Sequence, residues 1–175
     1  MAKYLGPPLR DAFCELLGTT LTDERIGAAV IAYRERFEAV GMFENAVYEG
    51  IPDALADLMN NGAVLYVATS KPRVYARQIL EHFGLAKCFA AVHGSELGGA
   101  LSNKGELIAH VLATEGLSPG NTTMVGDRHH DIAGAKEVGV HPVGVLWGYG
   151  TREELADAGA KGLVERPHEL ARLVD

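Results

Sequence analysis

Cysteine, tryptophan and proline are scarce in this sequence: its 175 residues include two cysteines, one tryptophan and seven prolines. Two cysteines are too few for the disulfide framework of a small secreted domain, so we interpret Cys14 and Cys88 as buried free thiols. No apolar run reaches the roughly 18 residues that a membrane span needs. The first residues show no cationic stretch followed by an apolar run. We therefore expect a cytoplasmic protein with no membrane partner.

Basic residues are also in the minority. There are 16 lysines and arginines against 23 acidic residues, which gives a formal net charge of −7. This charge opposes nonspecific binding to nucleic acid, and we expect no nucleic-acid partner. Hydrophobic residues make up 47% and charged residues 22% of the chain, a globular profile. The length suits one domain of ordinary size, or a compact core with a small appendage.

Several catalytic signatures are missing. The sequence has neither a Gly-x-Ser-x-Gly nucleophile turn nor the Gly-x4-Gly-Lys-[Ser/Thr] loop that cradles phosphates. The seven histidines are scattered, except for His129 and His130. Neighbouring side chains on a helix point apart, so this pair is not expected to chelate one ion.

The pattern of apolar residues differs between the first part of the chain and the rest. Apolar residues recur at helical spacing from Leu9 to Phe43, with Thr22 as the expected N-cap of the second helix. From Tyr48 onward, short apolar runs alternate with amphipathic segments. We expect strands at residues 63–68, 89–92, 122–125, 143–146 and 163–164, and helices at 52–60, 72–83, 104–114, 132–138, 151–159 and 167–173. Val74 is expected on the inward face of the 72–83 helix. This alternation predicts an α/β fold: a mostly parallel sheet with helices on both faces.

In such sheets, ligands bind beyond the carboxyl ends of the strands. Asp127 follows the apolar run that ends at Val125, and Asp131 stands four residues later at the start of a helix. Mg²⁺ takes one or two carboxylates and leaves room for water and a phosphate oxygen. The alternative is a helix N-terminus that simply favours acidic residues.

Two further segments occupy comparable places. Thr69-Ser70-Lys71 follows an apolar strand, where hydroxyl and backbone N–H groups could hold a phosphate oxygen, or could form an ordinary helix cap. Lys104 stands at the start of another helix, where a cation is electrostatically unfavourable. On this pattern alone, Lys104 is either functional or merely solvated.

Together these segments resemble the haloacid-dehalogenase-like (HAD) hydrolases, in particular their phosphoglycolate-phosphatase-like branch. The resemblance rests on the hydroxyl motif Val67-Ala-Thr-Ser-Lys-Pro72, the lysine motif Ser102-Asn-Lys104, the acidic motif from Val125 to Ala135, and residues 143–155. It extends from about Gly6 to the end of the chain. It implies a HAD-like (Rossmannoid) core at residues 48–175 that lacks its first strand, and a partial helical cap at residues 1–47.

The resemblance also implies chemistry. It assigns phosphoryl binding to Thr69 and Ser70, charge neutralisation at the phosphate to Lys104, and the Mg²⁺ cofactor to Asp127, while Asp131 supports the metal or Lys104. The family's nucleophile is the first Asp of an Asp-x-Asp-x-Thr motif, and this sequence contains no such motif. We therefore expect no nucleophile in this chain, impaired or absent turnover, and an N-terminally truncated member of the family.

In the family, the missing strand lies between the strand ending at Thr69 and the strand ending at Asp127. Three arrangements follow: a fragment of a longer enzyme, direct pairing of these two strands, or a strand supplied by another chain, including self-association through exposed edges. The leading functional hypothesis is a Mg²⁺-dependent phosphatase of a small phosphorylated metabolite, such as phosphoglycolate or a nucleotide monophosphate. The alternatives are a non-catalytic phosphate- or metal-binding regulatory relative and a mutase of the same superfamily.

Overall fold

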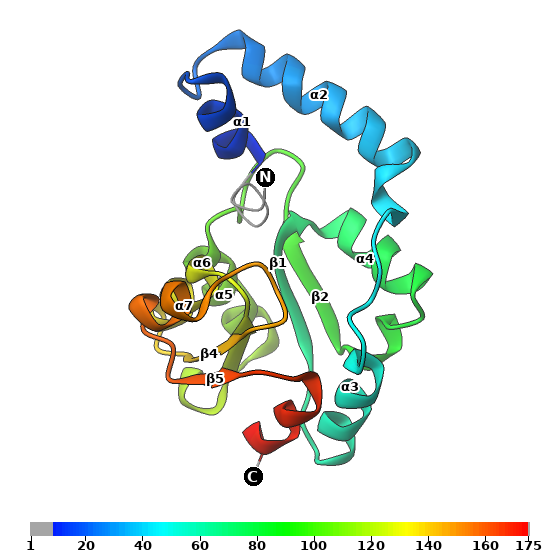
Figure 1. Cartoon of the computed structure of the whole chain (residues 1–175), viewed down its shortest axis with the longest axis vertical. Helices are drawn as coiled ribbons and strands as arrows, with labels where there is room; N and C mark the ends of the chain where they lie inside the picture. The colour runs from blue at the N-terminus through cyan, green and yellow to red at the C-terminus, as the bar shows by residue number, and fades with distance from the viewer. Residues whose placement is uncertain (1–8, 175) are drawn as a thin grey trace. The chain divides into compact units, whose positions relative to one another are not determined.

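The structure is a computed structural model that describes residues 9–174 (Figure 1). The chain divides into two compact units, residues 1–46 and 47–175, and each is described by itself. Within the described residues, no helix combines the length and apolar character needed to cross a bilayer. Cys14 and Cys88 are free, as expected, but they are half-buried and not fully buried.

The first unit is helical, as predicted. Its elements are α1 (Leu9–Leu17), α2 (Glu24–Ala39) and the short 3₁₀ helix η2 (Gly41–Phe43). An aromatic contact joins α1 to α2, because the rings of Phe13 and Tyr33 meet edge to face at 6.2 Å. The predicted N-cap Thr22 is wrong by one residue. Asp23 caps α2 because its carboxylate accepts the backbone N–H of Arg25 at 2.9 Å and also pairs with the Arg25 guanidinium.

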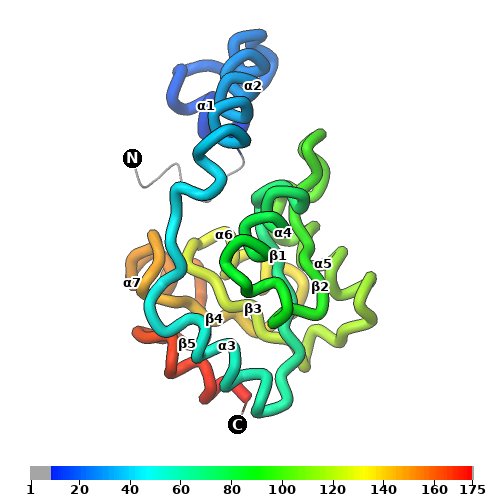
Figure 2. The backbone as a smooth tube through the Cα atoms, turned by 90° about the vertical axis from the view of Figure 1, so that its right-hand side faces the viewer, coloured from blue at the N-terminus to red at the C-terminus, as the bar shows by residue number. Residues whose placement is uncertain are grey.

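The second unit alternates helices and strands, which confirms the α/β class (Figure 2). Its helices are α3 (Ile51–Asn60), α4 (Arg73–His82), α5 (Lys104–Glu115), α6 (His129–Glu137) and α7 (Arg152–Ala158), with the 3₁₀ turns η3 (Ala86–Cys88), η4 (Pro119–Asn121) and η5 (Pro167–Leu173). Its strands are β1 (Tyr66–Pro72), β2 (Ala91–Ser95), β3 (Thr123–Gly126), β4 (His141–Val145) and β5 (Gly162–Val164).

The strands form two separate parallel sheets. One has the order β1-β2, and the other has the order β3-β4-β5. Among the described residues, β1 therefore pairs with β2 only, and β3 pairs with β4 only. The expectation that the strands ending near Thr69 and Asp127 could close up and pair directly is not met in this structure.

Two local predictions differ from the structure. The apolar run predicts a first strand at residues 63–68, but β1 runs on to Pro72, because Thr69 pairs with Gly94 and, after an irregularity, Pro72 pairs with Ser95. Val74 is predicted to face inward, but it is 46% exposed. The buried residues of α4 are Tyr75 and Ala76, and Ile79 and Leu80 are half-buried.

Apolar clusters cover both faces of the β3-β4-β5 sheet. One cluster joins α3, β4, β5 and η5 through Ala54, Leu58, Val143, Val145, Val164 and Leu170. The other joins α5 and α6 through Ile108, Leu112 and Ala135, with Met124 of β3 packed against it. Helices α4 and α5 both contact β1 and β2. The predicted two-sided helical cover is thus confirmed for the three-stranded sheet.

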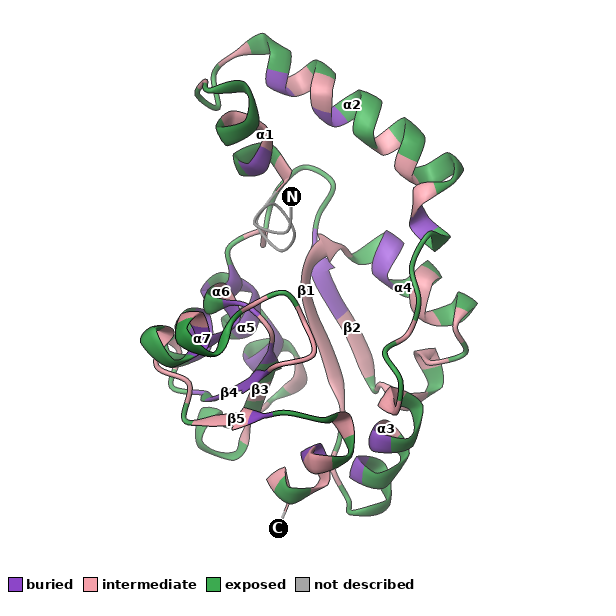
Figure 3. Ribbon diagram, in the orientation of Figure 1, coloured by how far each residue is buried: buried purple, intermediate pink, exposed green. Residues whose placement is uncertain are grey.

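Burial differs between the strands (Figure 3). Four of the five residues of β4 are buried, as expected for a parallel strand covered on both faces. Every residue of β1 is only half-buried, and Val125 of β3 is 38% exposed. β1 and β3, which each pair with one described strand only, are thus less buried than the central strand β4.

Candidate functional site

Asp127 lies directly after β3, in the turn that leads into α6. Its carboxylate Oδ2 accepts the backbone N–H of Tyr149 at 2.8 Å, so the loop after β4 is tied to this turn. The contact requires glycine on both sides of Tyr149. A Cβ atom at Gly148 would overlap the Asp127 side chain, and one at Gly150 would overlap the Asp127 carbonyl oxygen.

Asp131 occupies the first turn of α6 and is buried. Its Oδ2 accepts the backbone N–H of Arg128 at 3.1 Å, which closes a capping box at the start of the helix. A Cβ atom at Gly126 would overlap the Asp131 side chain, so Asp131 packs directly on the end of β3. Asp131 therefore has the capping role that the alternative interpretation predicts, and it also has a second partner.

That partner is Lys104, the first residue of α5. Its Nζ lies 3.0 Å from Asp131 Oδ1, and it donates a hydrogen bond of 3.0 Å to the carbonyl oxygen of Ala68 in β1. The two side chains are only 8% and 11% exposed. Lys104 is therefore a buried cation, not a solvated one. It connects β1, at Ala68, with the first turn of α6.

Thr69 and Ser70 follow Ala68 and still belong to β1. The Thr69 hydroxyl oxygen accepts the backbone N–H of Lys71 at 3.2 Å, and the Ser70 carbonyl accepts the Ser95 hydroxyl at 2.8 Å. Burial lowers the pKa of the Lys71 ammonium. The sequence pattern predicts these residues in a loop at the entrance to a helix. They are instead held in extended backbone by the irregular pairing with β2.

The predicted residues thus gather through a chain of contacts. Lys104 bridges Ala68, which precedes Thr69, to Asp131, and Asp131 packs against Gly126, which precedes Asp127. The printed contacts therefore join Lys104 of α5, Asp131 of α6 and Ala68 of β1, while Thr69 and Asp127 are the next residues in sequence after Ala68 and Gly126. Such a set can hold a phosphoryl group and a hard cation.

Glu154 is a member of this region that sequence reasoning missed. Its Oε1 accepts the backbone N–H of His129 at 3.0 Å and contacts the Arg128 Nε and His129 Nδ1 atoms, both at 2.9 Å. Burial alone would raise the pKa of Glu154, but these hydrogen bonds outweigh it and lower the pKa to about 2. The sequence signal is the capping box that begins at Thr151. It locates the helix without indicating this partner.

Two other groups near the acidic residues were also missed. Partial burial raises the pKa of the Tyr48 phenol, and the nearby Tyr149 phenol and Asp127 carboxylate raise it further. The Nε2 atom of His130 is buried without a hydrogen-bond partner, and burial lowers the pKa of this imidazole. Within residues 9–174, no three His, Cys, Asp or Glu side chains are grouped so that they could hold a metal ion.

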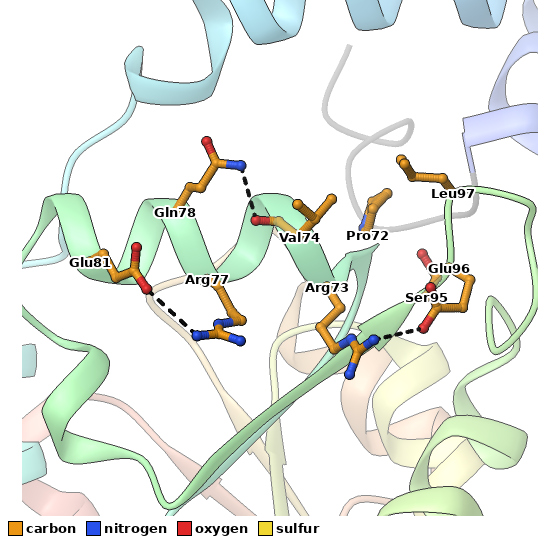
Figure 4. Close-up of a pocket in the computed structure, with 9 residues that line it drawn as sticks. All are labelled: Pro72, Arg73, Val74, Arg77, Gln78, Glu81, Ser95, Glu96 and Leu97. Carbon is orange, nitrogen blue, oxygen red and sulfur yellow. Dashed lines mark hydrogen bonds and ion pairs between the residues drawn. The ribbon is translucent and has the colours of Figure 1, made fainter.

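A separate hollow of about 520 Å³ lies beside α4 (Figure 4). Arg73 and Arg77 line it, and they pair loosely with Glu96 at 3.5 Å and with Glu81 at 3.9 Å. Neither Thr69, Lys104, Asp127 nor Asp131 lines this hollow. It is therefore distinct from the predicted site.

Comparison with known proteins identifies similar hydrolases and phosphatases, and a similar kinase. Residues 1–145 match the family described as haloacid dehalogenase-like hydrolase. A 5'-nucleotidase of Pseudomonas aeruginosa is 46% identical over 155 residues, which are 89% of this chain and 69% of that protein. A phosphoglycolate phosphatase of Synechococcus elongatus is 30% identical over 73% of this chain and 59% of its own length. The tyrosine-protein kinase PtkA of Mycobacterium tuberculosis is 40% identical over 83% of this chain, which spans about half (49%) of that kinase.

The fold is also found in solved structures. The crystal structure of a predicted phosphatase from Clostridium acetobutylicum superimposes with a TM-score of 0.94 at 41% identity, covering 99% of this chain and 79% of that one. The sequence match, the fold and the relatives agree with the resemblance inferred from the hydroxyl, lysine and acidic motifs. The similar proteins include phosphatases. The chain belongs to the haloacid dehalogenase-like hydrolase family.

Proposed function

We propose that this chain carries most of the active site of a Mg²⁺-dependent phosphomonoester hydrolase that acts on a small phosphorylated metabolite. The observation that carries the proposal is the buried contact of Lys104 with both Asp131 and the Ala68 carbonyl. A buried ammonium held between β1 and the first turn of α6 offers a fixed positive charge to a phosphate. The relatives, which include a 5'-nucleotidase and a phosphoglycolate phosphatase, support the same class of substrate.

Each predicted residue has a role in this proposal. The Thr69 hydroxyl and the polar groups of Ser70 bind phosphoryl oxygens, and Lys104 neutralises charge on the phosphate. Asp127 binds the metal. Asp131 supports the phosphate site by holding Lys104 in place. Asp127 fits a hard cation because its Oδ2 is oriented by the Tyr149 N–H, and Mg²⁺ needs only one or two carboxylates beside water. When bound, Mg²⁺ would withdraw negative charge from the phosphoryl oxygens.

This sequence contains no Asp-x-Asp-x-Thr motif, so the attacking group of the proposed reaction would have to come from another segment. Covalent phosphoryl transfer needs a nucleophile, so turnover by this chain alone is expected to be impaired or absent. The edges of β1 and β3 that lack a strand neighbour would accept an additional parallel strand carrying that aspartate. Residues 1–47 would act as a partial cap that selects the substrate and excludes water. We also propose a cytoplasmic location.

The test is phosphate release with Mg²⁺ from a panel that includes phosphoglycolate and nucleoside monophosphates. Three proteins are compared: this chain, a version with an Asp-x-Asp-x-Thr strand fused before residue 1, and the same fusion with Asn in place of the first aspartate. Release is expected only from the fusion that carries aspartate, and Lys104→Ala should abolish it. If the aspartate fusion folds and releases no phosphate, the enzymatic proposal fails.

A non-catalytic phosphate- or metal-binding relative is the second candidate, and the missing motif favours it. Calorimetric titration of this chain with Mg²⁺ and inorganic phosphate separates the two ideas. Binding that accompanies an inactive aspartate fusion would indicate a regulatory module. If neither ligand binds, the regulatory alternative is excluded.

A further inference from the structure

Residues 147–150, Trp-Gly-Tyr-Gly, have no role in the proposed reaction, although they touch its central carboxylate. Gly148 and Gly150 lie so close to Asp127 that a side chain at either position would overlap it. Between them, the backbone N–H of Tyr149 donates to Asp127 Oδ2 at 2.8 Å. The backbone at Tyr149 is therefore fixed against Asp127 from both sides.

The side chain at this fixed position is not used for packing. Tyr149 is 53% exposed, whereas Trp147, two residues earlier, packs against the core cluster. A second exposed aromatic residue, Tyr48, is 45% exposed and contacts Tyr149 through the two phenol groups. Tyr48 comes from the segment before α3, so two distant parts of the second unit place these two phenol groups near each other.

An exposed aromatic pair held beside a phosphate site can recognise the group that the phosphate is attached to. Planar bases stack on aromatic rings, and each stacked base contributes about 1–3 kcal/mol to binding. A short aliphatic phosphoester such as phosphoglycolate has no planar surface to offer. A rigid backbone anchor also lowers the entropic cost of presenting the ring.

We propose that Tyr149, together with Tyr48, forms a stacking surface for the heterocyclic base of a nucleoside monophosphate, and that this surface sets the substrate preference of the site. The inference rests on the proposed function, because it assumes that the phosphate lies near Asp127 and Lys104. It adds the chemical class of the leaving group, which the relatives leave open between nucleotides and phosphoglycolate.

The test compares two ligands that differ by a base. Adenosine 5'-monophosphate and ribose 5-phosphate are titrated into the full chain with Mg²⁺, by calorimetry and by the fluorescence of Trp147, the only tryptophan of the sequence. We expect the nucleotide to bind about tenfold more tightly than ribose 5-phosphate. Its binding should also change the Trp147 emission.

Two variants at one position separate the ring from the hydroxyl. Tyr149→Leu should reduce the affinity ratio of the two ligands to about one, while Tyr149→Phe should preserve most of it. Both variants keep the backbone N–H that Asp127 accepts. Tyr48→Leu is the second variant, should Tyr149→Leu fail to fold, and it should reduce the ratio at least threefold.

The outcomes distinguish this inference from the function on which it rests. If both ligands bind equally to the unmodified chain, or if Tyr149→Leu keeps the ratio, the stacking surface is refuted and the phosphate site stands. If neither ligand binds with Mg²⁺ present, both proposals fail.

Discussion

Lys104 and Asp131 place two charges in the interior, where each depends on the other. With side chains only 8% and 11% exposed, neither can be solvated by water if its partner is removed. Removing one member of a buried pair is costlier than removing both, because a lone buried charge remains. The pair is therefore a structural element of the second unit as well as a candidate part of its phosphate site.

We predict that Lys104→Met lowers the free energy of unfolding by about 3 kcal/mol, because Asp131 is left as an uncompensated buried carboxylate. The double variant Lys104→Met/Asp131→Asn should be more stable than Lys104→Met alone. Urea unfolding measures both, with Lys87→Met, at an exposed position, as the control. Additive losses in the double variant would contradict the buried-pair interpretation.

Glu154 makes stability dependent on pH. Its pKa is lowered from the ordinary value of 4.5 to about 2, so the folded chain binds this proton less readily than the unfolded chain. The contribution of Glu154 is complete above pH 4.5 and is lost as the pH falls from 4.5 towards 2. The three hydrogen bonds on one carboxylate oxygen are the physical source of this contribution.

Glu154→Gln should lower the free energy of unfolding by about 2 kcal/mol at pH 7, since it weakens charge-assisted hydrogen bonds. Its deficit relative to the unmodified chain should shrink as the pH falls below 4.5. Denaturant unfolding at a series of pH values provides the measurement. Asp157→Asn, at an exposed position of the same helix α7, is the matched control. A deficit that stays constant down to pH 2 would show that Glu154 does not titrate in this way.

At the scale of elements, local sequence patterns predicted the existence of nearly every helix and strand. Thr151 caps α7 with its side chain on the Glu154 N–H, and Gly159 ends that helix in a left-handed conformation, as the capping pattern indicates. The end of β1 could not be predicted, because it depends on pairing with Gly94 and Ser95 more than twenty residues away. The contact of Lys104 with Ala68 is likewise a tertiary contact that short-range patterns do not contain.

Helices α5 and α6 approach each other closely through glycines. A Cβ atom at Gly134 would lie 2.8 Å from the Gly105 backbone nitrogen and 3.0 Å from the Lys104 Cβ. Glycine in a helix interior normally destabilises the helix by about 1 kcal/mol relative to alanine. Here that cost is offset by close packing, which also positions Lys104.

Gly134→Ala should therefore destabilise the chain by about 2 kcal/mol, because backbone atoms of α5 cannot move aside without displacing Lys104. Gly27→Ala in α2 is the matched control, since a Cβ atom at Gly27 would meet no other atom within 4 Å. It should raise helix stability by about 0.5–1 kcal/mol. Thermal unfolding followed by circular dichroism compares the two. Stabilisation by Gly134→Ala would rule out the close contact.

At the scale of the whole molecule, the sequence predicted the α/β class and the order of its motifs. It did not predict whether β1 and β3 pair with each other. In the structure they belong to two separate parallel sheets, and most residues of β1 and β3 are half-buried or exposed. Pairing across sheets depends on the twist and packing of all the surrounding helices. No local pattern of residues encodes that outcome.

Unpaired strand edges favour association with other strands, because their backbone N–H and C=O groups can form hydrogen bonds with an added strand. We predict that this chain self-associates as its concentration rises, and that Val125→Lys, which places a charge on exposed β3, shifts the equilibrium towards the monomer. Sedimentation velocity over a hundredfold range of concentration measures this shift. Val74→Lys, on α4 with a similar exposure of 46% against 38%, should have no effect. Equal association of both variants would place the contact elsewhere, and fusing an additional strand should suppress association if the β1 and β3 edges cause it.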